Sequence, residues 1–389
     1  MDYRKLKAHK IFDGYKFIAD SVLIVSKNGL IEELIPVENA GDGVENFNGI
    51  LCPGLINCHC HLELSHMKGL IPENTGLVDF VFKVVTKRHH SEEEILHAIE
   101  DAESEMLNNG IVAIGDICNN ELTIPQKQKE NLLYYNFIEA SGWLPSVSKM
   151  RFQRSINLLK EFSKLSTSSS IVPHAAYSVS QNLWSEIQPH FENRTVTIHN
   201  QETAFEDEFF LRGKGDLTRM YEMMKIDNTH HQPTGRSSLQ SYFDKLEKAK
   251  NSILVHNTFM KQEDIDYIKL KTHPDSYRDK LRTFICLCVN ANKYIESAMP
   301  PVEMFRQNKC SIVLGTDSLA SNWSLNILDE IKTIRKNFPL IPLEEILQWA
   351  TINGAKALEL DSQLGSFEKG KKPGVVLINE HNLSSNRLV

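Results

Sequence analysis

Length, composition and charge already exclude several classes of protein. The 389 residues are enough to bury a large core, with room for one big domain and a smaller one. A content of 41% hydrophobic, 24% charged and 8% aromatic residues is typical of an ordinary globular protein. The net charge of −7 argues against nucleic acid and anionic membranes as partners.

The N-terminus and the cysteines both favour the cytoplasm. The first seven residues lack the apolar core of a signal peptide, and no uncharged apolar run is long enough to span a bilayer. The seven cysteines form no C-x-x-C pair, and several lie in runs expected to be buried strands. A disulfide scaffold or a zinc ribbon is therefore disfavoured, and we expect reduced thiols in a cytoplasmic protein.

The first 48 residues predict short strands joined by tight turns. Val22–Ser26 and Leu30–Pro36 are apolar runs separated by a Lys-Asn-Gly turn. Near the C-terminus, Val375–Ile378 again has the pattern of a strand. We expect residues 1–48 and 360–389 to form one small, β-sandwich-like domain built from both chain ends.

Eight apolar, β-branched runs follow the N-terminal segment, and amphipathic helical patterns separate most of them. The runs are Ile50–Asn57, Ile111–Ile117, Leu132–Glu139, Ser170–Pro173, Val196–Ile198, Ile253–Val255, Thr283–Val289 and Ile312–Gly315. The helical patterns include Ser91–Asn109 with a capping box at Ser91 and Glu94, Gln181–Glu192, Leu239–Lys250, Leu325–Asn337 and Leu343–Leu358. Continuously apolar strands that alternate with helices predict a parallel sheet. Eight units over residues 49–359 favour an α/β fold of the (β/α)8 TIM-barrel type over a doubly wound sheet.

A long polar segment interrupts this alternation after the fifth strand. Residues 212–238 are rich in glycine, histidine and other polar residues. Long loops at the carboxyl end of a barrel usually shape a substrate pocket, and we expect this one to do so.

Histidines and an aspartate stand where predicted strands end. They are His59, His61, His174, His199, His256 and Asp317. Side chains two apart on a strand lie on one face, so the His-x-His pair can direct two imidazoles to one point. In a parallel barrel all strand ends of this kind meet on one face, where active sites lie. A catalytic metal needs three or four N/O ligands and an open position. His59, His61, His199 and Asp317 supply such a set.

Neighbouring residues supply candidate hydrolytic groups. Glu202 follows His199 by three residues and is a candidate proton carrier between water and a leaving nitrogen. His256, together with Asp317, is a candidate for orienting the nucleophile or stabilising charge on the adduct. His174 is a candidate substrate contact. Each residue also has an ordinary structural alternative, such as a buried hydrogen-bonded histidine or a helix-capping aspartate. Only the combination of these residues favours a catalytic site over ordinary structural roles.

These motifs resemble the amidohydrolase superfamily, and more narrowly its zinc-dependent aminohydrolase (deaminase) branch. The resemblance is carried by Pro53–His61, His199-x-x-Glu202, His256, Gly315–Ser318 and the closing segment Leu364–Ile378. It implies one zinc on His59, His61, His199 and Asp317, with Glu202 and His256 catalytic. A narrower resemblance, to aminofutalosine deaminases, rests on His61–Ser65, Phe137–Gly142 and Pro233–Ser238.

Charged loop residues near the expected mouth are candidate substrate contacts. They are Glu63, Asp79, Arg88, Glu139 and Arg236. A polar, nucleoside-like ligand needs such groups, although each of these residues has the alternative of an ordinary surface charge.

The fourth strand favours one metal over two. Binuclear members of the superfamily bridge their metals with a lysine or glutamate at the end of this strand, and Ser170–His174 contains neither. We expect a single divalent ion, most readily Zn²⁺, although Fe²⁺ and Mn²⁺ also accept N/O ligands.

The expected activity is hydrolysis of a C–N bond other than a peptide bond. The resemblance implies deamination of an adenine- or nucleoside-like ring, of the aminofutalosine type, with release of ammonia. Alternatives are another ring (guanine, cytosine or pterin), a cyclic amide, or a C–Cl bond; a non-catalytic metal-binding protein would need neither Glu202 nor His256. The cytidine-deaminase fold is excluded because C-x-x-C is absent. The expected partner is a small-molecule substrate, and a homodimer is compatible with the family.

Overall fold

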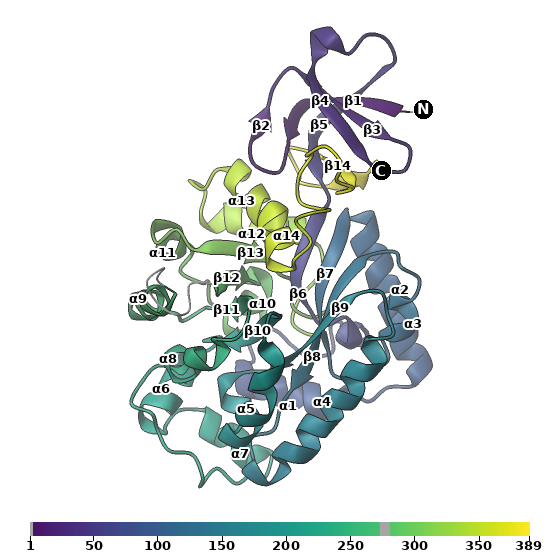
Figure 1. Cartoon of the computed structure of the whole chain (residues 1–389). Coiled ribbons are helices and arrows are strands. Elements are labelled where there is room, and N and C mark those ends of the chain that lie inside the picture. Colours follow the sequence, from purple (N-terminus) through teal and green to yellow (C-terminus); the bar gives the residue numbers. More distant parts are fainter. Residues whose placement is uncertain (1–2, 273–280) are drawn as a thin grey trace.

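The structure is a computed structural model that describes residues 3–272 and 281–389. Its strands form three sheets, one of which combines strands from both chain ends, while the other two are parallel. Figure 1 shows the purple N-terminal strands and the yellow β14 together at one end of the molecule, with the helix-rich part below them.

The two ends of the chain meet in a seven-stranded sheet with the order β15-β14-β5-β1-β3-β4 and β2 paired to β1. Its strands are β1 (Tyr3–Phe12), β2 (Phe17–Ile18), β3 (Ser21–Ser26), β4 (Ile31–Pro36), β5 (Val44–Pro53), β14 (Val375–Ile378) and β15 (Ser385–Arg387). β14 runs antiparallel to β5, with Val376 opposite Cys52. A separate buried cluster that includes Leu6, Leu23 and Val375 forms the core of this sheet.

Two four-stranded parallel sheets form the rest of the strand framework. One contains β6 (Leu55–Cys60), β7 (Ile111–Cys118), β8 (Leu133–Ala140) and β9 (Ser168–Pro173); the other contains β10 (Thr195–Asn200), β11 (Asn251–His256), β12 (Arg282–Leu287) and β13 (Ser311–Leu314). Isolated parallel bridges join Cys60 to Asp317 and Ala175 to His199, at the carboxyl ends of strands from both sheets. The mixed α/β architecture with parallel strands is confirmed.

The first predicted run, Ile50–Asn57, proves to be parts of two strands. β5 ends at Pro53 within the terminal sheet, whereas β6 begins at Leu55 and pairs with β7. A Cβ on the intervening Gly54 would lie 2.2 Å from Val112 Cγ1 and 2.6 Å from the Pro373 carbonyl oxygen, so only glycine fits there. Because both strands are buried at this point, the apolar pattern runs through the break.

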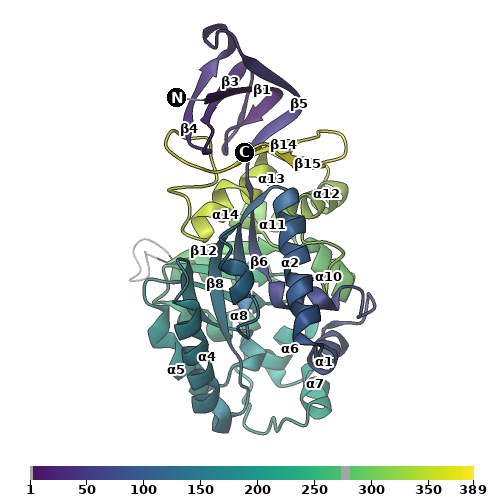
Figure 2. The same cartoon turned by 90° about the vertical axis from the view of Figure 1, so that its right-hand side faces the viewer.

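Helices alternate with the parallel strands, as the sequence predicts. They are α1 (Leu77–Lys87), α2 (Glu92–Asn108), α3 (Ile124–Lys127), α4 (Ser148–Phe162), α5 (Gln181–Ile187), α6 (Ala204–Arg212), α7 (Leu217–Met223), α8 (Ser238–Tyr242), α9 (Gln262–Lys271), α10 (Val289–Glu296), α11 (Val302–Gln307), α12 (Ile327–Asn337), α13 (Leu343–Ala350) and α14 (Ile352–Ala357), with a 3₁₀ helix η2 (Leu62–Met67) after β6. α4 packs against β8, β9 and α5 (Figures 1 and 2). Among the described residues, no helix is long and apolar enough to cross a bilayer.

Local signals explain where several helices begin and end. The capping box at the start of α2 is present, because Ser91 Oγ accepts from the Glu94 amide and Glu94 Oε2 accepts from the Ser91 amide. The predicted helix Leu343–Leu358 is broken at Thr351 into α13 and α14. The polar insertion contains a helix of its own, α7.

Candidate functional site

Four side chains from the carboxyl ends of three strands converge on one buried point. His59 lies near the end of β6 with His61 just after it, His199 lies in β10, and Asp317 follows β13. Their ligand atoms all lie within 4.8 Å of one another, and all four residues are buried. Asp317 Oδ1 is 3.4 Å from His61 Nε2 and 3.6 Å from His59 Nε2. The structure therefore brings together the four residues that the sequence suggests as metal ligands.

The donor set fits a divalent cation. Both ring nitrogens of His59 are buried without a hydrogen-bond partner, and Nε2 of His61 faces Nε2 of His199 at 3.3 Å. Buried polar atoms left in this way are costly unless something binds them. Nδ1 of His199 donates to the carbonyl oxygen of His174 at 2.8 Å, which leaves Nε2 for a metal. Three imidazoles and one carboxylate are typical ligands of zinc.

The charges of these groups suit metal binding. Burial lowers the pKa of His61 to about 3 and the pKa of His199 well below its usual value, so both rings are neutral at pH 7. Burial opposes ionisation of Asp317, but the adjacent imidazoles of His59, His61 and His256 outweigh it and lower the pKa of Asp317. Neutral imidazole and ionised carboxylate are the forms that bind a metal.

The backbone is strained at two of the strand ends. Asp317 has a φ of 59° and His256 a φ of 71°, both in the left-handed region that non-glycine residues rarely adopt. The amides of Thr316 and Asp317 both donate to the His59 carbonyl oxygen, at 3.0 and 3.1 Å. Ser321 Oγ donates to Asp317 Oδ2 at 2.5 Å. These bonds hold the carboxylate against the imidazoles.

Glu202 and His256 form a second buried pair beside the histidine and aspartate cluster. Glu202 Oε2 lies 3.6 Å from His256 Nε2. Nδ1 of His256 donates to Asn292 Oδ1 at 2.8 Å, which fixes the ring. Burial, together with the charges of Asp317 and Glu296, raises the pKa of Glu202 well above its usual value. Burial therefore favours the protonated form of Glu202, which is the form able to donate a proton.

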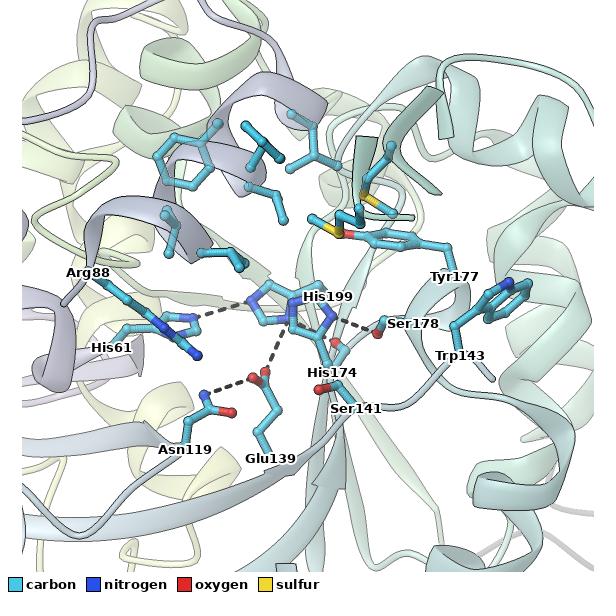
Figure 3. Close-up of a pocket in the computed structure, with 18 of the residues that line it drawn as sticks. His61, Arg88, Asn119, Glu139, Ser141, Trp143, His174, Tyr177, Ser178 and His199 are labelled. Carbon is cyan, nitrogen blue, oxygen red and sulfur yellow. Dashed lines mark hydrogen bonds and ion pairs between the residues drawn. The ribbon is translucent and has the colours of Figure 1, made fainter. Parts of the chain in front are cut away.

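A cavity of about 650 Å³ opens from this cluster, and two carboxyl groups line it beside the histidines. Glu63 Oε2 accepts from the Asn119 amide at 2.9 Å, and Glu139 Oε2 accepts from Asn119 Nδ2 at 2.9 Å. Glu139 Oε1 is buried without a hydrogen-bond partner. Burial raises the pKa of both carboxyls to about 7. His174, whose Nδ1 lies 2.7 Å from Ser178 Oγ, lines the same cavity (Figure 3).

The far part of the cavity combines apolar side chains with arginines. Val81 and Val84 of α1 and Met220 and Met223 of α7 line it. Arg219 of α7 pairs with Asp79 of α1 at 3.1 Å, so the two helices are joined. Sequence reasoning proposed Asp79 as a substrate contact, but it lies outside the lining.

Arg88, Arg151 and Arg154 line the cavity, and within the described residues none of them forms an ion pair. Nε of Arg151 is buried without a hydrogen-bond partner, while Arg154 donates to the Asn119 carbonyl oxygen at 3.0 Å. Burial and the charges of Arg154 and Arg88 lower the pKa of Arg151. Figure 3 shows Arg88, Asn119 and Glu139 on one side of the His174 and His199 rings, with Tyr177 and Trp143 on the other.

The predicted substrate contacts have different positions. His174, Glu63 and Glu139 line the cavity, whereas Arg236 is exposed just before α8 and lies outside the lining. Its location in a polar insertion does not determine the direction in which its side chain extends.

Sequence reasoning missed several residues of the site. They are Asn119, Trp143, Arg151, Arg154 and Asn292. A usable signal existed for one pair, because Arg151 and Arg154 are three apart and so share a helix face after the third parallel strand. Asn292 lies in α10, directly after the seventh parallel strand.

Comparisons with known proteins agree with this geometry. A model described as "Amidohydrolase family" matches residues 50–387. An adenosine deaminase of Helicobacter pylori is 27% identical over 331 residues, which cover 84% of this chain and 78% of that protein.

Two solved structures are similar in fold. A crystal structure of H. pylori aminofutalosine deaminase in complex with methylthio-coformycin superposes with a TM-score of 0.79 at 21% identity, covering 97% of this chain and 92% of that one. An adenosine deaminase from Xanthomonas campestris with bound zinc has a TM-score of 0.71 at 18% identity, covering 97% of this chain and 85% of that one.

Proposed function

The chain belongs to the amidohydrolase family, and on this premise we propose that it deaminates an adenine-type ring with release of ammonia. The observation that carries the proposal is the Glu202–His256 pair, buried next to the four-residue ligand set and open to the cavity. A closed structural metal site needs neither a proton carrier nor a cavity. The H. pylori adenosine deaminase supports an adenine-type substrate.

We propose that one divalent metal binds to His59, His61, His199 and Asp317, and that it is most readily zinc. The zinc-containing X. campestris enzyme supports this choice, while iron(II) and manganese(II) remain chemical alternatives. A second group, Glu139, His174 and His199, shares His199 with the first. Because Nδ1 of His199 is engaged with a carbonyl oxygen, this ring has one nitrogen to offer. Two metals would both need this one nitrogen of His199, which argues for a single metal.

In the proposed mechanism His59, His61, His199 and Asp317 would hold the metal, which when bound would lower the pKa of water towards ~7 and so make the hydrolytic nucleophile available. Asp317 and His256 accept or orient the proton that this water loses. Glu202, whose protonated form is favoured by burial, gives its proton to the ring nitrogen beside the amino-bearing carbon. The ionised Glu202 then takes the hydroxyl proton of the adduct and passes it to the amino group, which leaves as ammonia as the C–N bond breaks. The proton held at Asp317 and His256 returns to Glu202 and restores its protonated form. Asn292 keeps the His256 ring in one orientation throughout.

The rest of the cavity indicates the kind of nucleoside that fits. Glu63 and Glu139 are acceptors for sugar hydroxyls, and Glu139 Oε1, 3.8 Å from His199 Nδ1, makes no hydrogen bond. Arg88, Arg151 and Arg154 line the same cavity without ion pairs among the described residues. Guanidinium groups recognise carboxylates and phosphates. We therefore propose a nucleoside whose substituent combines an apolar part with an anionic group. The aminofutalosine type satisfies this description.

The finer architecture belongs to the same proposal. Residues 49–359 are proposed to form one (β/α)8 barrel, supported by the Cys60–Asp317 and Ala175–His199 bridges between the two parallel sheets. Residues 1–48 and 360–389 are proposed to form the small β-domain, supported by their shared sheet and separate core. All seven cysteines are free thiols, which supports a cytoplasmic location. The homodimer stays a prediction.

An ammonia-release screen of the zinc-loaded protein tests the proposed reaction. We expect turnover of adenine nucleosides, with S-adenosylhomocysteine and aminofutalosine, which both carry a carboxylate, ahead of adenosine and methylthioadenosine. Guanine, cytosine, pterins, cyclic amides and chlorinated rings form the comparison arms. Ammonia from guanine, cytosine or pterins alone, or product only from the amide or chloride arms, would overturn the adenine assignment.

A further inference from the structure

Lys127, at the end of α3, is a fully buried cation outside the lining of the cavity. Its side chain is 0% exposed, as is that of Asp116 in β7. Lys127 Nζ lies 2.6 Å from Asp116 Oδ2, 2.8 Å from Asn136 Oδ1 and 3.3 Å from Cys118 Sγ. These contacts use all three donors of the ammonium group. Neither Lys127 nor Asp116 lines the cavity.

Stability alone gives little reason for this pair. Removing two charges from water is costly, and apolar replacements of buried ion pairs are often neutral or stabilising. The position of the pair is more informative, because the second oxygen of Asp116 holds another part of the chain. Asp116 Oδ1 accepts from the backbone amide of Leu62 at 2.9 Å. Leu62 directly follows the metal-ligand candidate His61.

The chain needs such a bond at this point because regular strand pairing fails there. The register between β6 and β7 shifts between Asn57 and Cys60, so the ladder does not hold the His-x-His segment evenly. At His61 the chain leaves β6 and enters η2, with a φ of −116° and a ψ of 77°. The carboxylate of Asp116 replaces the missing ladder bond just beyond the turn.

The same end of β7 also holds a residue of the cavity. The backbone amide of Asn119 donates to Glu63 Oε2 at 2.9 Å, and Glu63 lies two residues after His61. Asp116 and Asn119 therefore fix both sides of the segment that carries His61 and Glu63. Lys127 balances the charge of Asp116, which would otherwise be a third carboxylate close to Glu63 and Glu139.

We infer that Asp116 and Lys127 are positioning residues: the buried pair fixes the backbone at Leu62 and thereby holds His61 in its metal-binding geometry. The inference rests on the proposed metal site. Outer residues that orient metal ligands typically change metal affinity by ~10–100-fold when replaced.

Asp116→Asn is the sharpest test of this inference. The amide has one acceptor oxygen, so it can serve either the Leu62 amide or the Lys127 ammonium, and one of the two bonds is lost. We expect the zinc dissociation constant, measured by competition with a chromophoric chelator, to rise by ~10–100-fold. Glu103→Gln is the matched control, because Glu103 is an equally buried carboxyl that bonds Gln126, Asn131 and Tyr134 but not the Leu62 segment. It should leave zinc affinity unchanged.

A second pair of variants separates position from folding. Lys127→Met leaves Asp116 charged and unpaired, and we expect a marked loss of thermal stability. In the double variant Asp116→Leu with Lys127→Met both charges are gone, and so is the acceptor for the Leu62 amide. We expect it to recover the lost melting temperature while zinc binding stays weaker than in the parent. Parental zinc affinity in Asp116→Asn and in the double variant, or equal weakening in Glu103→Gln, would overturn the inference.

The zinc titration needs no substrate. Failure of the ammonia screen would therefore remove the proposed function and leave this inference standing. If the parent is active but Asp116→Asn binds zinc as tightly as the parent does, this inference falls and the proposed function stands.

Discussion

The metal end and the arginine end of the cavity differ in what fixes their residues. His59, His199 and Asp317 stand in or next to parallel strands, and strand pairing together with the Cys60–Asp317 and Ala175–His199 bridges holds them in place. Arg88 directly follows α1 and Arg151 lies in α4, and these helical positions form what we call the rim. The strand ends form a rigid centre suited to chemistry, whereas the helical rim is free to vary and suits substrate selection.

Glu202→Gln at the strand-end centre should give the largest change in activity. The amide cannot donate an acidic proton, so we expect kcat to fall by roughly 10²-fold or more while zinc affinity is retained. Steady-state ammonia release and chelator competition measure the two quantities. Glu208→Gln, on the exposed face of α6, is the control and should behave as the parent. Full activity of Glu202→Gln would remove the proton-carrier role.

Arg151→Met tests the rim, and its effect should depend on the substrate. A hydrogen bond to a charged group contributes ~1.5–3 kcal/mol, which corresponds to ~10–100-fold in kcat/KM. We expect that loss for S-adenosylhomocysteine or aminofutalosine and little change for methylthioadenosine. The neutral substrate is the internal control. An equal loss on both substrates would mean that Arg151 supports the fold of the rim and does not recognise an anion.

Removal of the metal should affect the centre and spare the rim. A bound ion at about 1,000 times its dissociation constant stabilises the native state by ~4 kcal/mol. We therefore expect chelation to lower the melting temperature by several degrees. For a chain of this size each kcal/mol lost shifts the melting temperature by at most ~2–4 °C. Zinc should restore it, and Arg151→Met should show the same shift as the parent. A melting temperature that ignores chelator and zinc alike would contradict the metal site.

The contrast between centre and rim also explains what the sequence could predict. His59, His61 and Asp317 could be grouped because the carboxyl ends of parallel strands meet wherever the loops run. Arg151 could not be grouped with them, because the direction of α4 depends on loops that carry no periodic signal. The prediction that Arg236 contacts the substrate failed for the same reason, because polar composition locates an insertion but does not orient its side chains. The split at Gly54 was hidden because two buried strands share one apolar pattern.

Glu206 joins the metal end of the cavity to the polar insertion, and its titration gives the smallest predicted effect. It lies in α6, where Oε2 accepts from the Glu202 amide at 3.3 Å and Oε1 accepts from Ser238 Oγ at the end of the insertion. Burial raises the pKa of Glu206 to about 8, against 4.5 for an ordinary glutamate. The folded state therefore holds a proton that the unfolded chain has already lost at pH 7.

The sign of the pH effect follows from this difference. A raised pKa in the folded state contributes stability that is complete below pH ~4.5 and is lost as the pH rises through about 8. Between pH 7 and 9 we expect the parent to lose about 1 kcal/mol from Glu206, or ~2 °C in melting temperature. Glu206→Gln has no proton to lose, so its melting temperature should fall less over this interval, whatever its value at pH 7. Thermal melts of the parent, Glu206→Gln and Glu208→Gln at both pH values measure the difference. Parallel curves for all three proteins would mean that Glu206 does not titrate at the junction, and that the insertion is anchored to Glu202 without a pH-dependent link.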